Sequence, residues 1–473
     1  MSSPLRERII AALTSSRSST AAWCAWGGYA AVRGVLGALS VRTDPATGAL
    51  FAKGSVTDNY RLAAHAWTHG EQMYFPGARG WLYPPQGAMV FVPFEVLPMR
   101  IGEAAWRAAS IGLMAWGAWR LAAALALIAE RTLSNASFPS PGQPALARSP
   151  HPPLVSAATF FPLLTLLLIA SCDGSARNGQ VNLPLAACLA LAAAACVRAA
   201  LLESSPIAQL DPKPLAHAAA NRAAWSWWEV SGWCLLGLML KIIMIVPILL
   251  CAAVFLRRLG WRLLIITGVF AVLPFAHPDL QYVATQYELA FAKVKEAFNF
   301  RGDQYADLGG ALTDLGLTPP EPLMQGIRVL AAALTLALCG LAARRLGPAR
   351  AGVAILCLGA PYLMLMNART EGVSYCILAV PVAALGAWEI VNSRRVPTRA
   401  GVAGLTVPLT LIALAILLVA AHVITGPIFG RSKDFLLRPL CAAAFYGLVS
   451  MQLVRGSFLA PLSPAERAAP DVP

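Results

Sequence analysis

The sequence predicts an all-α polytopic membrane protein, on three observations. Hydrophobic residues make up 58% of the 473-residue chain, and charged residues only 13%, about half the ~25% of a soluble domain. Several apolar runs approach or exceed the ~18–20 residues that a helix needs to cross a bilayer. These runs are continuous and not alternating, which excludes a transmembrane barrel.

Twelve apolar stretches are predicted to cross the membrane as one domain of residues 1–473. They are residues 19–41, 86–101, 104–129, 155–171, 183–201, 227–255, 262–276, 326–343, 351–366, 373–391, 402–424 and 436–454. Two sizeable polar insertions, 42–85 and 277–325, are predicted to carry loop helices. The ten cysteines lie almost entirely inside apolar segments, which favours small buried side chains over disulfides or metal ligands.

The net charge of +14 does not indicate a nucleic-acid partner, because the basic residues gather in short loops between the spans. An excess of arginine in such loops marks them as cytoplasmic. Counting from a cytoplasmic N-terminus places both insertions and the 367–372 loop outside. The three arginine clusters comprise Arg257, Arg258 and Arg262; Arg344, Arg345 and Arg350; and Arg394, Arg395 and Arg399.

The same count places the polar link of residues 172–182, CDGSARNGQVN, on the cytoplasmic side, away from the first insertion. A re-entrant half-helix at 86–101 would move this link outside. A second irregularity would then be needed to restore the parity of the span count. Lys241 and Pro247 make the 227–255 segment the natural place for such a break. Both topologies remain open at this point.

The first insertion holds a predicted helix after Ser55. Asp58, Arg61, His65 and His69 fall within one arc of about 80° at helical spacing. Ser55 or Thr57 would cap the helix, and Gly70 would end it. One interpretation is a membrane-surface helix that holds a carboxylate towards a polar site. The alternative is an amphipathic helix whose charges only meet water.

Three further polar features lie elsewhere in the chain. Asn178, Gln180 and Asn182 open a span, as part of a site or as a simple polar turn. Lys241 lies inside an apolar run, where a charge costs ~2.5–3.5 kcal/mol on insertion scales, so a function or a carboxylate partner on another span is expected. Arg369 and Glu371 lie in the loop before the span at 373–391.

These features together resemble the integral-membrane glycosyltransferases of the C superfold, and most closely family 87, the polyprenyl-phosphate-mannose type. One departure is that the proline usually close behind the lysine lies six residues on, at Pro247. The resemblance is carried by Asp58, Tyr60, Ala66, Gly70, Tyr74 and Tyr83-Pro84-Pro85, by Asn178-Gly179-Gln180-Val181-Asn182, and by Lys241 followed by Arg257-Arg258 and Trp261-Arg262.

The resemblance implies inverting transfer of a sugar, a hexose such as mannose or a pentose, from a polyprenyl-phosphate donor to a cell-envelope lipid or glycan. Transfer would take place at the outer face of the plasma membrane of a bacterium. Asp58 is the matched candidate for the general base, and neither a metal nor another cofactor is expected. The alternative is a transporter or flippase, which has no need for a long polar insertion with a poised carboxylate. Candidate binding residues are Arg61, His65, His69, Tyr83, Asn178, Gln180, Asn182, Lys241, Arg369 and Glu371.

Overall fold

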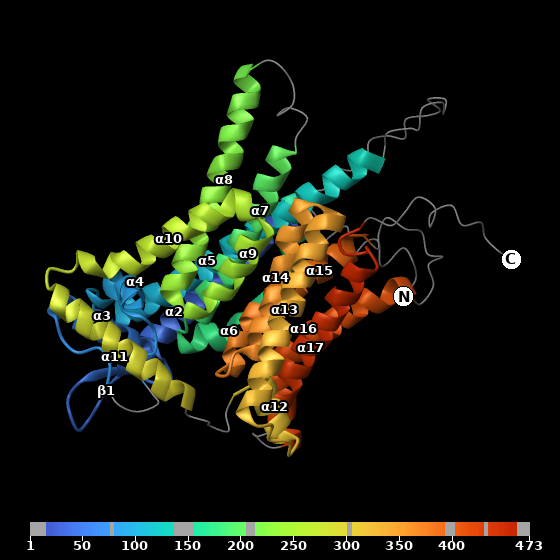
Figure 1. Cartoon of the computed structure of the whole chain (residues 1–473). Helices are drawn as coiled ribbons and strands as arrows, with labels where there is room; N and C mark the ends of the chain where they lie inside the picture. The colour runs from blue at the N-terminus through green and yellow to red at the C-terminus, as the bar shows by residue number, and fades with distance from the viewer. Residues whose placement is uncertain are drawn as a thin grey trace, which may run out of the picture.

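The computed structural model confirms the all-α class (Figure 1). The only strands among the described residues form a short antiparallel hairpin, β1 (Val41–Thr43) and β2 (Leu50–Ala52), in which Val41 pairs with Ala52. The structure describes residues 16–75, 80–136, 156–204, 213–299, 305–392, 403–429 and 434–460.

The α-helices are α2 (Ser16–Ser40), α3 (Thr57–His69), α4 (Pro85–Glu95), α5 (Met99–Ala136), α6 (Ala157–Asn178), α7 (Asn182–Glu203), α8 (Lys213–Leu240), α9 (Ile245–Val254), α10 (Trp261–Val272), α11 (Leu280–Asn299), α12 (Leu308–Asp314), α13 (Glu321–Leu346), α14 (Pro348–Met366), α15 (Cys376–Asn392), α16 (Ala403–Phe429) and α17 (Asp434–Val454). Short 3-10 turns are η2 (Ile242–Met244), η4 (Leu273–Ala276) and η5 (Gly372–Tyr375), and η3 (Leu256–Gly260) is a π-helical turn.

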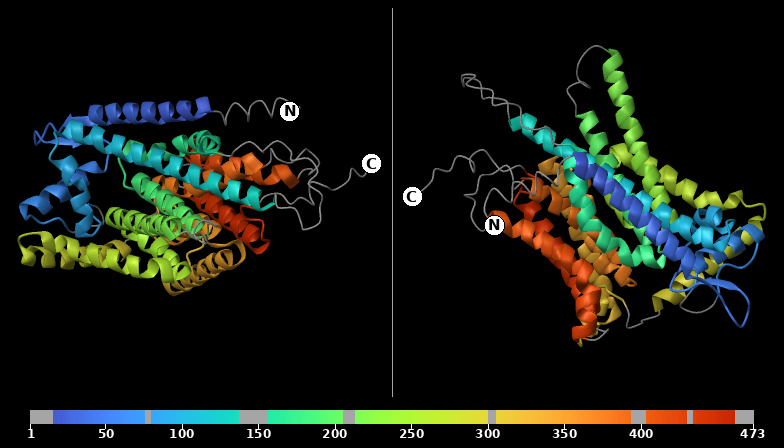
Figure 2. Two further views of the ribbon diagram at one scale, coloured as in Figure 1. Left: turned by 90° about the horizontal axis from the view of Figure 1, so that it is seen from above. Right: turned by 180° about the vertical axis from the view of Figure 1, so that it is seen from behind.

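Eight helices among the described residues are long and apolar enough to cross a membrane, so the chain is a multi-pass membrane protein. They correspond to eight of the twelve predicted spans. Helix α7, rich in alanine, is buried on nearly all sides between α5, α8 and α14. Outer helices instead expose large apolar side chains, such as Leu264 (73% exposed) and Leu330 (71%), to the lipid. Figure 2 shows α2 lying along α5 at the edge of the bundle.

The predicted span 86–101 is wrong. Helix α4 has 11 residues, which is about 16 Å of helix against the ~30 Å of a bilayer core. The chain then breaks before α5 begins at Met99. Pro98 explains the break, because a proline disfavours the helical conformation of the residue before it.

The predicted span 227–255 is also not continuous. Helix α8 ends at Leu240, and Lys241 is extended, with φ −160° and ψ 128°. The chain then makes the turn η2 and starts α9. Pro247 lies in the first turn of α9, where its missing N–H costs no helical hydrogen bond. The break is therefore at Lys241, and the proline lies in the first turn of the next helix.

With these two irregularities, the polar link 172–182 lies at the same end of the bundle as the first insertion. The backbone N–H of Val56 donates to the carbonyl of Asn178 at 3.0 Å, so the link lies beside the first insertion. The simple count, which separated the two, is wrong. The alternative with a half-helix at 86–101 and a break near Lys241 is correct.

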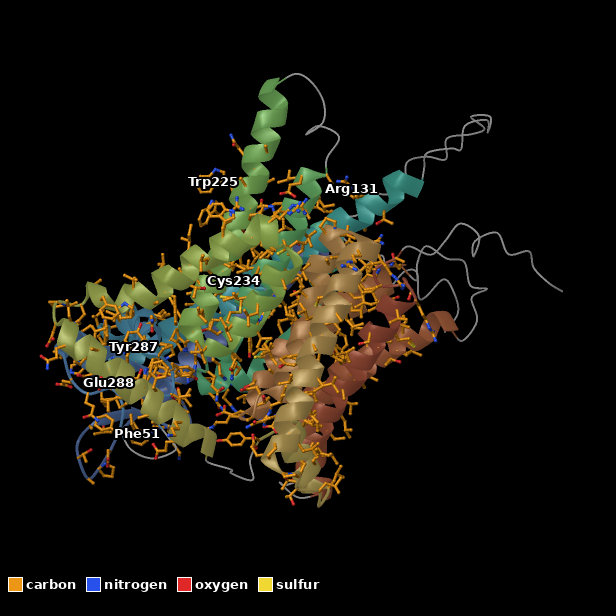
Figure 3. The ribbon with its side chains drawn as sticks, in the orientation of Figure 1. Phe51, Arg131, Trp225, Cys234, Tyr287 and Glu288 are labelled. Carbon is orange, nitrogen blue, oxygen red and sulfur yellow. The ribbon has the colours of Figure 1, made fainter. Side chains whose placement is uncertain are left out.

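The bundle has two chemically different ends. Phe51, Tyr287 and Glu288 lie at the end that carries Asp58, and Arg131 and Trp225 lie towards the opposite end (Figure 3). We call these the Asp58 end and the arginine end.

Ion pairs and hydrogen bonds place the basic loops at the arginine end. Arg258 pairs with Glu203 at the close of α7 (2.7 Å). Arg350 donates to Thr132 at the close of α5 (3.1 Å). The cluster of Arg394, Arg395 and Arg399 lies outside the described residues.

The two polar insertions pack against each other at the Asp58 end. The Tyr282 hydroxyl on α11 donates to the carbonyls of Ala66 (3.0 Å) and Glu71 (2.7 Å). Lys293 on the same helix donates to the carbonyl of Phe75 at 2.6 Å. Helix α11 therefore holds the first insertion in place over the end of the bundle (Figure 1).

Candidate functional site

Helix α3 forms where the first insertion was predicted to be helical. It ends at Gly70, whose φ of 72° is left-handed and suits glycine, as expected. Its N-cap is Val56, and no side chain caps it, contrary to the expectation for Ser55 or Thr57. The Ser55 hydroxyl instead accepts a hydrogen bond from the Thr57 N–H (3.3 Å) within the preceding turn.

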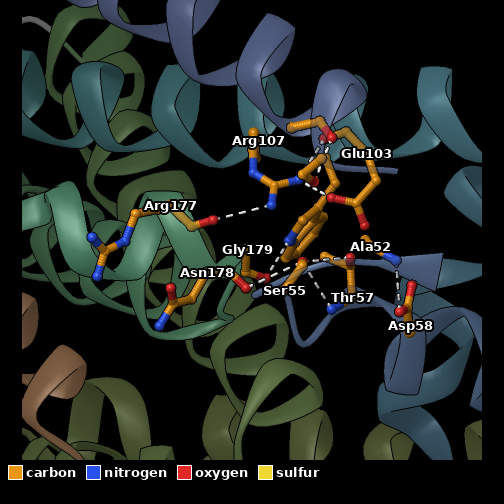
Figure 4. A network of polar contacts seen from close by, with 12 residues as sticks. Ala52, Ser55, Thr57, Asp58, Glu103, Arg107, Arg177, Asn178 and Gly179 are labelled. Carbon is orange, nitrogen blue, oxygen red and sulfur yellow. Dashed lines mark hydrogen bonds and ion pairs between the residues drawn. The ribbon is translucent and has the colours of Figure 1, made fainter. Parts of the chain in front are cut away.

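Asp58 is half-buried with its two oxygens in different situations. Its Oδ2 accepts from the N–H of Ala52 at 2.9 Å, so β2 fixes the carboxylate (Figure 4). Its Oδ1 is shielded from solvent and has no hydrogen-bond partner. Burial raises the pKa of Asp58 above its ordinary value, opposed by the Ala52 N–H and by the charges of Arg61 and Arg107. A carboxylate oxygen without a partner is able to accept a proton.

The polar link docks onto the turn that precedes α3 (Figure 4). The carbonyl of Asn178 accepts from the Ser55 hydroxyl (3.3 Å) as well as from Val56. Trp106 on α5 donates to the carbonyl of Gly179 at 2.7 Å. Gly179 has φ 65°, and a Cβ there would lie 2.6 Å from Thr57 Cγ2, so only glycine allows this approach.

A chain of hydrogen bonds joins three of the predicted polar features. Lys241 Nζ donates to Asn182 Oδ1 at 3.0 Å. Asn182 donates in turn to Gln180 Oε1 (2.5 Å), and Gln180 Nε2 donates to Glu371 Oε2 (2.7 Å). We call Lys241, Asn182, Gln180 and Glu371 the polar chain.

The break at Lys241 is what permits the polar chain. Because Lys241 leaves the helical path, its ammonium reaches the first residue of α7 at the Asp58 end. Its bonded partner is an amide oxygen, and no carboxylate of the described residues lies within ion-pair distance of it.

Two tyrosines connect the polar chain to α3. The backbone N–H of Val181 reaches the Tyr60 hydroxyl at 3.5 Å, and the rings of Tyr60 and Tyr83 lie 5.9 Å apart. Burial raises the pKa of Tyr83 to about 12, opposed by its hydrogen bond with Tyr60, while the nearby charge of Glu371 adds to the rise. Both phenols therefore stay neutral near pH 7 and act as hydrogen-bonding groups.

Arg369 lies in the same loop as Glu371. Its Nε donates to the Tyr305 hydroxyl at 2.9 Å, and the guanidinium lies 5.3 Å from the centre of the Tyr305 ring. Tyr305 is next to Ala306, whose N–H donates to the carbonyl of Thr370 at 2.7 Å. The second insertion thus positions the loop that carries Arg369 and Glu371.

Arg61, His65 and His69 belong to a different set of contacts. The Arg61 guanidinium donates to the carbonyls of Phe94, Glu95 (2.9 Å) and Leu97 (2.9 Å) and so closes the end of α4. His65 Nδ1 lies 3.1 Å from Glu95 Oε1. The His65 and His69 rings stack at 3.9 Å, and both are open to solvent.

Sequence reasoning did not identify Tyr305 or Glu95 as contributors. Neither stands in a recognisable motif, and both act through partners distant in the sequence, Arg369 and His65. Tyr60 was named only as a motif position, although it connects α3 to the polar chain. Helical spacing puts Tyr60 on the buried face of α3, and this spacing was the signal that could have identified it.

Comparisons with known proteins give few matches. No model of a known protein family matches the sequence, and no curated protein matches it. Among solved structures, the chain aligns with the crystal structure of ArnT from Cupriavidus metallidurans bound to undecaprenyl phosphate. The alignment has 14% sequence identity and a TM-score of 0.36, and it covers 91% of this chain and 77% of that chain.

Proposed function

We propose that this protein is a membrane glycosyltransferase of the C-superfold type, which moves a sugar from a polyprenyl-phosphate donor to an acceptor hydroxyl with inversion. The observation that carries the proposal is the polar chain. It gathers Lys241, Gln180 and Glu371 from three distant segments at the end of the bundle where Asp58 lies. Each of these residues belongs to a motif or loop that the sequence itself indicates.

Asp58 acts as the general base in this proposal. The acceptor hydroxyl must lose its proton as its oxygen bonds to the anomeric carbon, and a carboxylate within hydrogen-bond reach serves that step. Oδ2 is held by Ala52, which leaves the unpartnered Oδ1 to take the proton. The raised pKa of Asp58 makes it a stronger base than an exposed aspartate.

The polar chain binds the donor. The bond from the anomeric carbon to the phosphate oxygen breaks with its electrons left on the polyprenyl phosphate, so negative charge builds there. Lys241 and Arg369 are the cations proposed to contact that charge. Glu371, Gln180 and Asn182 are the groups that suit sugar hydroxyls, with Tyr83 beside them as a neutral phenol.

In this proposal the reaction takes place at a membrane boundary. The Asp58 end is the outer face of the plasma membrane of a bacterium in this proposal, because the described arginine clusters lie at the opposite end. A lipid-linked donor would enter sideways from the bilayer, and the acceptor would be a lipid or glycan of the cell envelope.

The proposal is tested with the purified protein in nanodiscs, polyprenyl-phosphate sugars labelled in a hexose or a pentose, and an envelope extract as acceptor. We expect label to move to an acceptor, with free polyprenyl phosphate as the second product. The alternative of a transporter or flippase predicts that the labelled donor crosses the bilayer of vesicles intact. Intact crossing without transfer would reject the transferase.

A further inference from the structure

A basic cleft lies at the Asp58 end and is not used by the proposed reaction. Its volume is about 290 Å³. Four cationic side chains line it, each from a different element: Arg33 from α2, Lys53 from the turn after β2, Arg107 from α5 and Arg177 from the end of α6. Figure 4 shows two of these residues, Arg107 and Arg177, with Asn178 beside them.

The four cations are only partly neutralised by the protein. Arg33 pairs with Asp173, and Arg107 pairs with Glu103. Lys53 and Arg177 have no acidic partner among the described residues, and both are exposed. Two positive charges therefore remain without an acidic partner, in a concave site whose walls come from four different elements.

Specific contacts hold the walls of the cleft together. Arg107 donates to the carbonyl of Arg177 at 3.0 Å, which ties α5 to the end of α6. Its guanidinium packs directly on Gly37 of α2, where a Cβ would lie 2.6 Å from Arg107 Nη1. The glycine thus lets α2 approach and close one wall of the cleft.

The surroundings indicate a lipid ligand. The outer part of α2 next to the cleft exposes Val32 (55%), Val35 (58%), Leu36 (48%) and Leu39 (62%). Acyl chains pack well on such a surface. The cleft volume is just below the ~300–1,000 Å³ of whole small-molecule sites, so it suits a head group with its chains outside. Basic pockets between membrane helices bind anionic head groups on the cytoplasmic or matrix side, and the same attraction between cations and phosphate applies to a cleft at the Asp58 end.

We propose that the cleft lined by Arg33, Lys53, Arg107 and Arg177 binds the phosphate of a membrane lipid. This site is separate from the polar chain, and the inference does not rest on the proposed glycosyl transfer. The lipid would present its phosphate as a monoester, a terminal group that can carry two negative charges, and free inorganic phosphate can carry the same charge. The test therefore has to separate these two sources.

The experiment uses the full chain in detergent and measures binding by native mass spectrometry. The probes are dioctanoyl phosphatidic acid, dioctanoyl phosphatidylcholine and inorganic phosphate. We expect phosphatidic acid to bind and phosphatidylcholine to bind far more weakly. Inorganic phosphate that binds as tightly as phosphatidic acid would identify the free ion as the ligand. Weaker binding of the ion would identify the lipid. Equal binding of both lipids would overturn the proposal.

Variants then locate the site. Lys53→Met and Arg177→Met should each weaken phosphatidic acid binding by about tenfold or more, the effect of losing one charged hydrogen-bond donor. Arg42→Met is the matched control, since Arg42 is an exposed cation of the same hairpin outside the cleft. Lys53 and Arg177 are both exposed, so these variants should fold. If Lys241→Met abolishes binding while both cleft variants keep it, the phosphate binds at the polar chain and the proposal is wrong.

Discussion

Asp58 combines a fixed position with an unused acceptor, which is the arrangement a general base requires. The neighbouring charges of Arg61 and Arg107 lower its pKa, but burial outweighs them. At the scale of single residues, the proposed chemistry therefore depends on one oxygen atom, Oδ1. Substitution by asparagine removes its basicity and keeps its shape.

Asp58→Asn should lower turnover by the ~10²–10⁴ that loss of general-base catalysis typically costs. Donor affinity should stay near that of the wild type, because the donor binds at the polar chain. Asp44→Asn, a change to a partly exposed carboxylate in the same insertion, is the control. Turnover and donor affinity are measured on purified protein. A folded Asp58→Asn enzyme with near-normal turnover would remove Asp58 from the role of base.

The raised pKa of Asp58 also predicts a pH dependence. A carboxyl whose pKa is higher in the folded protein favours folding while it is protonated, and this contribution is lost as pH rises through the folded pKa. Asparagine resembles the protonated form, so Asp58→Asn should be at least as stable as the wild type near pH 7. Melting temperatures at acidic and neutral pH measure this. A marked loss of stability at pH 7 would mean that the charged form is favoured in the folded state.

Lys241 is the second residue with a sharp expectation. Because its partner is the Asn182 amide and not a carboxylate, Lys241→Met leaves no buried anion unpaired. We expect donor affinity to fall by tenfold or more with little change in melting temperature. Lys295→Met, on the exposed side of α11, is the control. A large fall in melting temperature with unchanged donor affinity would make Lys241 a structural residue.

At the scale of elements, the site depends on how the 172–182 link meets α3. Gly179→Ala would force a Cβ to within 2.6 Å of Thr57 Cγ2 and 3.1 Å of Ser55 Oγ, at a left-handed backbone position that costs about 1–2 kcal/mol for other residues. We expect lower thermal stability and lower turnover together. Gly112→Ala on α5, whose Cβ would meet nothing within 4 Å, should be neutral. A stable, fully active Gly179→Ala protein would contradict this contact.

The contact of Arg61 with the end of α4 gives a prediction that distinguishes a structural role of Arg61 from a role in donor binding. Arg61 donates to three carbonyls at the end of α4, and hydrogen bonds to a charged group contribute about 1.5–3 kcal/mol. Arg61→Met should therefore lower the melting temperature and leave donor affinity unchanged. Arg100→Met, an exposed arginine at the start of α5, serves as control. Loss of donor affinity without loss of stability would return Arg61 to the donor site.

At the scale of the whole molecule, the sequence was most informative where the signal is local. Long apolar runs predict helices that span, and Gly70 predicts the end of α3, because both depend on neighbouring residues alone. From the sequence alone, the half-helix before Pro98 and the break at Lys241 belonged to one of two possible topologies. The decision between the two depends on contacts such as Val56 with Asn178, which are 122 residues apart in sequence.

In the candidate site, too, the sequence identified residues but not the contacts between them. Motif positions identified Lys241, Gln180 and Asn182 separately, and the loop before the span at 373–391 supplied Glu371. The fold joins all four. Helical spacing placed Arg61, His65 and His69 on one arc with Asp58. However, spacing shows only which face a side chain occupies, and that face meets the end of α4 over much of its length. Periodicity cannot say which neighbour a face will have.

The orientation of the whole molecule gives the last prediction. In a background cleared of native cysteines, Thr47→Cys and Thr318→Cys report the two insertions, Arg177→Cys the polar link, and Ser204→Cys the end of α7; all four positions are exposed. Because the described arginine clusters lie at the other end, the first three should react with an impermeant thiol reagent in intact cells, and Ser204→Cys only after lysis. Labelling of Thr47→Cys without Arg177→Cys would separate the link from Asp58 and contradict the fold. Labelling of Ser204→Cys alone would keep the fold and invert the protein, placing the proposed transfer in the cytoplasm.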